Sequence, residues 1–145
     1  MFIKAEKEAL WSSTGTLKFN ANGGGGMHVT NYNSNANEQT IVEVPAFRLR
    51  DLLNRKIDLL KFDIEGGEME VLRDCKDSLG NVDRIFVEHH SFLGQPQELG
   101  EFFGILENAG FRINIHVDFQ ARQPFLERIT FNDKDSWLNV FAFRE

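Results

Sequence analysis

The feature that most constrains the fold is an alternation of strand-like and helix-like apolar patterns through the second half of the chain. Residues 57–64 are apolar on both parities, which is typical of a strand covered on both faces, as in a parallel sheet. Residues 68–75 then fit a helix, and residues 83–89 fit a second buried strand. One helix between two buried strands predicts that the strands are neighbours in an α/β sheet.

The pattern continues to the end of the chain. Pro96 is expected to open a helix, because proline favours the first helical position, and Gly110 is expected to end it. Residues 111–117 and 137–143 read as strands, with no helical pattern between them. The sequence therefore predicts a mostly parallel α/β sheet with an antiparallel strand at the C-terminus.

The first third of the chain is less regular. Strands are expected over residues 16–19 and over residues 40–44, the latter ending at Pro45, followed by a short helix over 47–54. Residues 20–37 predict a loop, and their four consecutive glycines do not resemble a phosphate loop, because no Gly-Lys-Ser/Thr follows. We expect a single partial domain over 1–145, with a lead-in over 1–56 and a βαβαββ core over 57–145.

Composition narrows the class of partner. The net charge is −6 and Lys and Arg form no cluster, which argues against nucleic acid and favours a neutral or cationic small molecule. No apolar run reaches the roughly 18 residues of a membrane span, and the N-terminus carries charges too early for a secretory signal. The single cysteine, Cys75, allows no internal disulfide, so a soluble cytoplasmic protein is expected.

Polar residues gather where two predicted strands end. Asp63 follows the first buried strand, and Glu88 stands near the end of the second. Ligands of open α/β sheets sit beyond the carboxyl ends of strands, so the two carboxylates are expected to approach each other. His89 and His90 come next, and adjacent strand residues point to opposite faces, so at most one histidine is expected in the site.

Each of these residues also has a structural explanation. Asp63 could cap the following helix, and Glu65 and Glu68 could serve the helix dipole. A buried Glu88 would need a partner. Asp63, Glu88 and one histidine would also suit a hard divalent cation such as magnesium, but their spacing is not diagnostic and we assign no metal ligand.

The motif from Lys61 to Glu68, followed by Val71-Leu72, resembles the Lys-x-Asp-x-Glu-Gly-x-Glu…Val-Leu signature of FkbM-type methyltransferases. Other segments resemble the same family in the same order along the chain: residues 9–15, 44–53, 88–89 and 106–111. The resemblance implies a Rossmann-like methyltransferase sheet, S-adenosylmethionine as cofactor, and O-methylation of a small hydroxylated substrate.

The resemblance also implies roles for individual residues. Asp63 would lie near the methyl donor and orient the substrate hydroxyl, and a carboxylate or histidine would accept the hydroxyl proton. The predicted site residues are Asp63, Glu65, Glu88 and His89 as catalytic, Ala9, Leu10 and Asp63 as cofactor-binding, and Glu68 and His90 as substrate-binding.

The sequence departs from the family pattern at two points. Gly67 stands where the family usually has alanine, and this difference is expected to be tolerable in a turn. The family's glycine-rich cofactor loop and ribose-binding acid would precede Ala9, and we find neither motif in the chain, which resembles the C-terminal half of the domain.

Two alternatives stay open. A truncated or degenerate fold could act without catalysis, self-associating as a homodimer through an exposed sheet edge. The spacing Asp58-x-x-Lys61-x-Asp63-x-Glu65 is also similar to a glycoside hydrolase motif, in which Asp63 and Glu65 would act. Lys61 replaces a required acid in that motif, and its barrel needs about 250 residues.

Overall fold

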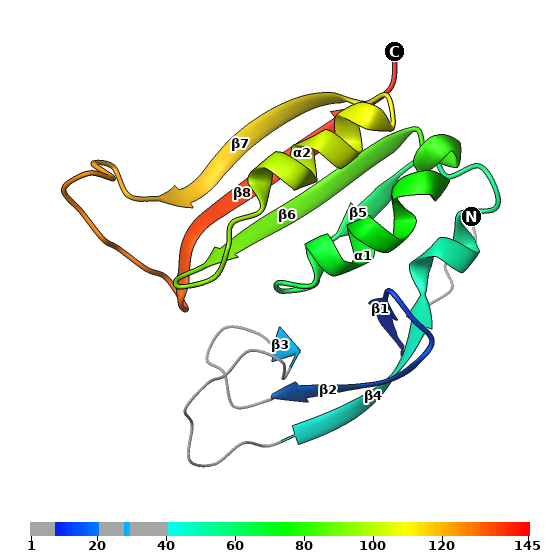
Figure 1. Cartoon of the computed structure of the whole chain (residues 1–145), viewed down its shortest axis with the longest axis horizontal. Coiled ribbons are helices and arrows are strands. Elements are labelled where there is room, and N and C mark those ends of the chain that lie inside the picture. Colours follow the sequence, from blue (N-terminus) through cyan, green and yellow to red (C-terminus); the bar gives the residue numbers. More distant parts are fainter. Residues whose placement is uncertain (1–7, 21–27, 30–40) are drawn as a thin grey trace.

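The computed structural model describes residues 8–20, 28–29 and 41–145. These residues form two four-stranded sheets, with the strand orders β1-β4-β2-β3 and β5-β6-β8-β7 (Figure 1). Helices α1 (Glu68–Cys75) and α2 (Leu99–Asn108) pack against one face of the second sheet (Figure 1). The prediction that the chain combines helices and sheets in an α/β fold is therefore confirmed.

The first sheet contains β1 (Ala9–Trp11), β2 (Gly15–Asn20), β3 (His28–Val29) and β4 (Ile41–Arg48). Strand β4 was expected to end at Pro45, which was wrong. Pro45 faces Thr16 of β2, and β1 pairs with β4 only from Ala46 onward. The proline therefore lies where β4 has one paired neighbour, and a missing N–H is tolerated at such a position. Most of the predicted loop over 20–37, including its four glycines, lies outside the described residues.

The helix predicted over 47–54 is smaller than expected. Phe47 and Arg48 belong to β4, where they face Leu10 and Trp11 of β1. Pairing with β1 keeps both residues extended, and only the 3-10 helix η1 (Leu49–Leu52) follows. Leu49 and Leu53 are nevertheless buried, as the apolar pattern predicts, whereas Leu52, also expected to be available for burial, is exposed.

The second sheet is mixed. Its strands are β5 (Leu60–Phe62), β6 (Arg84–Phe92), β7 (Arg112–Gln120) and β8 (Lys134–Phe143). Strands β5 and β6 are parallel, whereas β8 pairs antiparallel with both β6 and β7. The antiparallel C-terminal strand is confirmed. The expected predominance of parallel pairing is not confirmed. Strand β8 lies between β6 and β7, which run parallel to each other, and pairs antiparallel with both.

Strand β5 is shorter than the predicted strand over 57–64. Ile57 forms only an isolated bridge to Val82, through hydrogen bonds of 2.9 Å to the Asn81 carbonyl and from the Asp83 amide. Leu59 is exposed between this bridge and β5. Strand β6, in contrast, continues three residues past His89 because β8 pairs with it as far as Phe92.

The two helices follow their sequence patterns closely, with one difference. Helix α1 has the predicted bounds and leads into the 3-10 helix η2 (Lys76–Asn81). Helix α2 does not begin at Pro96, because Glu98 has a left-handed φ of 55°, which cannot lie inside a right-handed helix. Gly110, with a φ of 84°, follows the C-terminus of α2 as predicted, and its amide donates to the Glu107 carbonyl.

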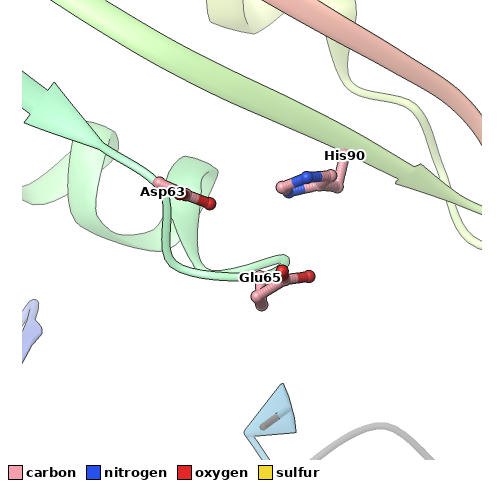
Figure 2. Close-up of side chains that lie close together, drawn as sticks. All are labelled: Asp63, Glu65 and His90. Carbon is pink, nitrogen blue, oxygen red and sulfur yellow. The ribbon is translucent and has the colours of Figure 1, made fainter. Parts of the chain in front are cut away.

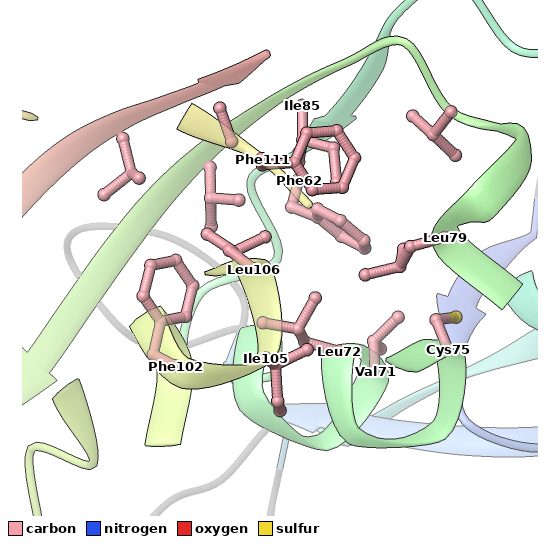
Figure 3. Packing of buried hydrophobic residues seen from close by; sticks show 14 of the residues in the cluster. Phe62, Val71, Leu72, Cys75, Leu79, Ile85, Phe102, Ile105, Leu106 and Phe111 are labelled. Carbon is pink, nitrogen blue, oxygen red and sulfur yellow. The ribbon is translucent and has the colours of Figure 1, made fainter. Parts of the chain in front are cut away.

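The core lies between the two helices and the second sheet (Figure 3). Its largest fully buried side chains include Phe62 of β5, Leu72 of α1, Ile85 of β6 and Phe102 of α2. Each such side chain contributes about 1.5–3 kcal/mol by leaving water. This packing fixes β5, β6 and α1 relative to one another, and the segments that follow the two strands therefore have a rigid base.

Polar contacts connect the first sheet to α1. Arg48 at the end of β4 donates two hydrogen bonds to Asp74, at 2.9 and 2.5 Å, and the Arg48 guanidinium lowers the pKa of the Asp74 carboxyl. Ser12 donates to Glu70 at 2.6 Å. Among the described residues, no helix is long and apolar enough to cross a membrane.

Candidate active site

The turn after β5 has an unusual backbone. Glu65 has a φ of 52° and Gly66 a φ of 94°, so two successive residues are left-handed. A Cβ on Gly66 would also lie 2.9 Å from a ring carbon of Phe92, so glycine is required there for both conformation and space. Glu65 has no such freedom, and strain of this kind in a non-glycine residue is typical of functional sites.

Glu68, the first residue of α1, holds this turn together. Its carboxylate accepts hydrogen bonds from the Gly66 amide, at 3.0 and 3.2 Å, and from the Ile64 amide at 3.3 Å. The Glu68 side chain is 3% exposed and contacts Nδ1 of His90 at 3.2 Å. These donors replace the water that a buried carboxylate loses.

His90 enters the site from β6. Its side chain is only 1% exposed, and its ring centroid lies 5.2 Å from that of Trp137 on β8. Figure 2 shows its ring beside the side chains of Asp63 and Glu65. One ligand atom from each of these three residues lies within 4.8 Å of the other two. We call Asp63, Glu65 and His90 the polar trio.

Two lysines neutralise part of the charge around the trio. Lys134 of β8, whose side chain is 4% exposed, lies 2.8 Å from a Glu65 oxygen and 5.5 Å from the centre of the Trp137 ring. Lys61 lies 3.1 Å from Asp63 and 3.3 Å from Glu88, and its hydrogen bond to Asp63 raises the pKa of the Lys61 ammonium. The ion pair through Lys61 connects Glu88 to the trio.

The structure thus brings four of the predicted site residues together: Asp63, Glu65, Glu68 and His90. Glu88 lies one contact away, beyond Lys61. His89 points to the opposite face of β6, where its ring centroid is 4.9 Å from that of Phe102. Burial lowers the pKa of His89. At most one histidine was expected in the site, and the structure brings His90 to the trio. It does not bring His89, one of the four residues predicted as catalytic, to the trio.

The predicted cofactor-binding residues Ala9 and Leu10 lie in β1, at an edge of the first sheet. Leu10 packs partly buried against the core. Next to them, Trp11 lies over Gly67: a Cβ at Gly67 would come 2.5 Å from Cζ3 of the indole and 3.3 Å from Cδ1 of Ile64. Glycine in place of the family's alanine was expected to be tolerable at position 67, and the Trp11 ring gives a reason why glycine fits there.

Lys134 is the site residue that sequence reasoning missed. It follows a polar segment that carries no clear periodicity, and it is 69 residues from Glu65. Only the insertion of β8 beside β6 brings it to the turn after β5. A lysine three residues before the predicted strand over 137–143 was the one available signal.

The arrangement supports two kinds of chemistry. A histidine whose Nδ1 contacts a carboxylate can accept a proton at Nε2, and nearby carboxylates can orient a hydroxyl or attract a cation. The trio can also ligate a metal, but with Glu65 in the place where Glu88 was expected. The described strands form two open sheets and no closed barrel, which removes the architecture that the glycoside hydrolase alternative requires.

Comparison with known proteins agrees with this geometry. A sequence profile described as the methyltransferase FkbM domain matches residues 4–113, a range that includes Asp63, Glu65, Glu68, Glu88 and His90. Neither the curated proteins nor the solved structures contain a significant match. The profile covers well over half of the 145 residues. The chain belongs to the FkbM methyltransferase domain family.

Proposed function

We propose that this protein transfers a methyl group from S-adenosylmethionine to a hydroxyl group of a small molecule. The observation that carries the proposal is the convergence of Asp63, Glu65 and His90 within 4.8 Å, in a chain of a methyltransferase family. Asp63 and Glu65 follow the carboxyl end of β5, and His90 lies on β6 three residues after Val87, where the parallel pairing of the two strands ends. Open α/β sheets bind ligands at the carboxyl ends of their parallel strands.

The reaction needs little covalent chemistry from the protein. The substrate oxygen attacks the methyl carbon, the carbon–sulfur bond breaks, and the hydroxyl proton must go to a base. Catalysis is therefore mainly positioning, together with a well-placed proton acceptor. In this proposal Asp63, which is partly exposed, orients the substrate hydroxyl, and His90 receives the proton at Nε2.

Electrostatics supports a cationic cofactor at this place. Four carboxylates form one connected network with two lysines: Asp63, Glu65, Glu68 and Glu88 on one side, Lys61 and Lys134 on the other. With His90 neutral, the network carries two net negative charges. The sulfonium of the methyl donor is positive, so the network attracts the donor more strongly than the neutral thioether product.

The experiment is a calorimetric titration with S-adenosylmethionine of the unchanged protein, of Asp63→Asn and of Asp58→Asn. Asp58 is exposed and precedes β5, so its substitution removes the same charge outside the trio. The proposal expects saturable binding that Asp63→Asn weakens about tenfold, the effect of one lost charge-assisted contact, and that Asp58→Asn leaves within about twofold. Absence of binding at millimolar cofactor contradicts the proposal.

Self-association is a second candidate function, supported by the open edge of the second sheet. Strand β7 is an edge strand, and its apolar residues Ile115 and Val117 are exposed. An exposed apolar edge is a template for pairing with a second copy. Light scattering during gel filtration tests this: a dimer that Ile115→Lys converts to a monomer supports an edge-paired assembly, and a monomeric unchanged protein excludes it.

A further inference from the structure

We propose that Asp63, Glu65 and His90 form a binding site for a divalent transition-metal cation, with Glu68 orienting the histidine. This inference goes beyond methyl transfer and does not rest on it. It follows from the spacing of the three donors, the state of the His90 ring, and the charge of the surrounding network.

The spacing is close to that of a coordination sphere. Metal–nitrogen and metal–oxygen bonds of about 2.0–2.2 Å place the ligand atoms of a tetrahedral ion about 3.3–3.6 Å apart. The ligand atoms of the trio lie within 4.8 Å of one another. An inward movement of roughly an ångström therefore closes the trio around an ion, and Asp63 can make it because its side chain is partly exposed.

His90 gives the cluster a feature that surface acids alone do not have. Its side chain is buried, and Nδ1 already contacts Glu68 at 3.2 Å. Within residues 8–20, 28–29 and 41–145, the hydrogen bond of the His90 ring runs through Nδ1, which leaves Nε2 available to a ligand. Figure 2 shows this ring turned toward Asp63 and Glu65, so an ion bound by the trio would be within reach of Nε2.

Glu68 completes an arrangement found around protein-bound metals. A ligating histidine usually donates its second ring N–H to a carboxylate, which fixes the tautomer and the ring orientation. The Glu68 carboxylate is itself held by the amides of Ile64 and Gly66. It is thus rigid enough to keep Nδ1 protonated and the Nε2 lone pair directed at the trio.

The two lysines do not block the ion. Of the two Asp63 carboxylate oxygens, Lys61 binds Oδ2, and of the two Glu65 carboxylate oxygens, Lys134 binds Oε2. Each carboxylate therefore keeps its other oxygen for a metal. The network of four carboxylates and two ammonium groups carries two net negative charges with His90 neutral. One divalent cation would balance that charge.

The donor set selects the class of ion. One imidazole nitrogen and two carboxylate oxygens suit Mn²⁺, Fe²⁺, Co²⁺ or Zn²⁺ better than Mg²⁺ or Ca²⁺, which prefer oxygen alone. Three protein ligands leave coordination positions open for a substrate oxygen. Polarisation of a bound hydroxyl by the ion is the one part of this inference that rests on the proposed function. With Nε2 on the ion, a carboxylate oxygen rather than His90 would accept the hydroxyl proton.

The experiment uses Co²⁺ and Mn²⁺ as probes. The full chain, stripped with a chelator, is titrated with Co²⁺ while the visible d–d absorption is recorded, and Mn²⁺ binding is measured by the loss of the free-ion electron paramagnetic resonance signal. We expect one saturable site. Asp63→Asn and His90→Ala should each weaken it tenfold or more, and Glu68→Gln by about 10–100-fold.

Asp58→Asn is the matched control, because Asp58 is exposed, precedes β5 and lies outside the network, so its substitution removes one carboxylate charge without touching the trio or its ion pairs. The affinity of this variant should stay within about threefold of the unchanged protein. Asp63→Asn keeps the test decisive if His90→Ala fails to fold, as checked by circular dichroism. Absence of saturable binding at millimolar Co²⁺ and Mn²⁺, or equal weakening by Asp63→Asn and Asp58→Asn, overturns the inference.

A parallel titration with S-adenosylmethionine separates the two proposals. Metal binding without cofactor binding refutes methyl transfer by this chain and leaves the metal site standing. Cofactor binding without metal binding refutes the metal site and leaves the methyltransferase proposal intact.

Discussion

The position of Trp11 over Gly67 determines whether replacing Gly67 with alanine raises or lowers the free energy of unfolding. Gly67 has a φ of −91°, which any residue adopts, so its backbone does not require glycine. Replacing such a glycine with alanine ordinarily stabilises a protein by about 0.4–1 kcal/mol, because the unfolded chain loses conformational freedom. With Trp11 present, the new Cβ would lie 2.5 Å from Cζ3 of the indole, and the ring or the turn must move.

Overpacking of this kind costs about 1–3 kcal/mol, which exceeds the entropic gain. Gly67→Ala should therefore destabilise the protein by roughly 1–2 kcal/mol, or about 2–8 °C in melting temperature for a chain of this size. In a Trp11→Ala background the same substitution should be neutral or stabilising. The expected coupling between the two positions is at least about 1 kcal/mol.

Urea denaturation of the four proteins in this cycle, followed by circular dichroism, measures the coupling directly. Gly80→Ala is a useful comparison, because a Cβ there meets no atom within 4 Å. Equal effects of Gly67→Ala with and without Trp11 would refute the reasoning. A stabilising Gly67→Ala in the unchanged background would refute it as well.

The remaining predictions concern two buried or paired groups on α1. Because the Arg48 guanidinium lowers the pKa of Asp74, the pair stabilises the fold above the unfolded pKa of about 3.8–3.9 and loses this effect as pH falls through the lower folded value. Asp74→Asn should lower the melting temperature at pH 7 and reduce its fall on acidification, whereas an unchanged melting temperature at pH 7 would show that the pair contributes nothing. Burial raises the pKa of the Cys75 thiol to about 12, so native protein at pH 8 should react with a disulfide reagent at least about a hundredfold more slowly than urea-unfolded protein. Comparable rates in the two states would mean that α1 opens readily.

Local patterns were sufficient to predict the part of the fold that carries the site. The helix over 68–75, the glycine after α2 and the acids that follow β5 are all encoded by residues close in sequence. The polar trio could be predicted in part, because two parallel neighbouring strands must end at the same edge of a sheet. His90 could not be distinguished from His89, because the choice depends on which face of β6 the helices cover.

The features that sequence reasoning missed depend on distant segments. Pairing with β1 extends β4 beyond Pro45 and prevents a helix from starting at Phe47. The insertion of β8 makes the second sheet mixed and delivers Lys134 to Glu65. Likewise, the reason for glycine at position 67 becomes visible only when the ring of Trp11, 56 positions earlier, is placed over it. None of these partners leaves a periodic signal near the residue that it affects.

The central claim is that the polar trio is part of the binding site for the methyl donor. Amide chemical-shift mapping in ¹⁵N-labelled protein, titrated with S-adenosylmethionine, tests it most directly. The account predicts saturable shifts concentrated at residues 63–68 and 88–90, weaker with the neutral thioether product. An absence of shifts at millimolar cofactor would contradict the claim. Shifts confined to β7 and the C-terminal end of β8, away from Lys134, would contradict it as well.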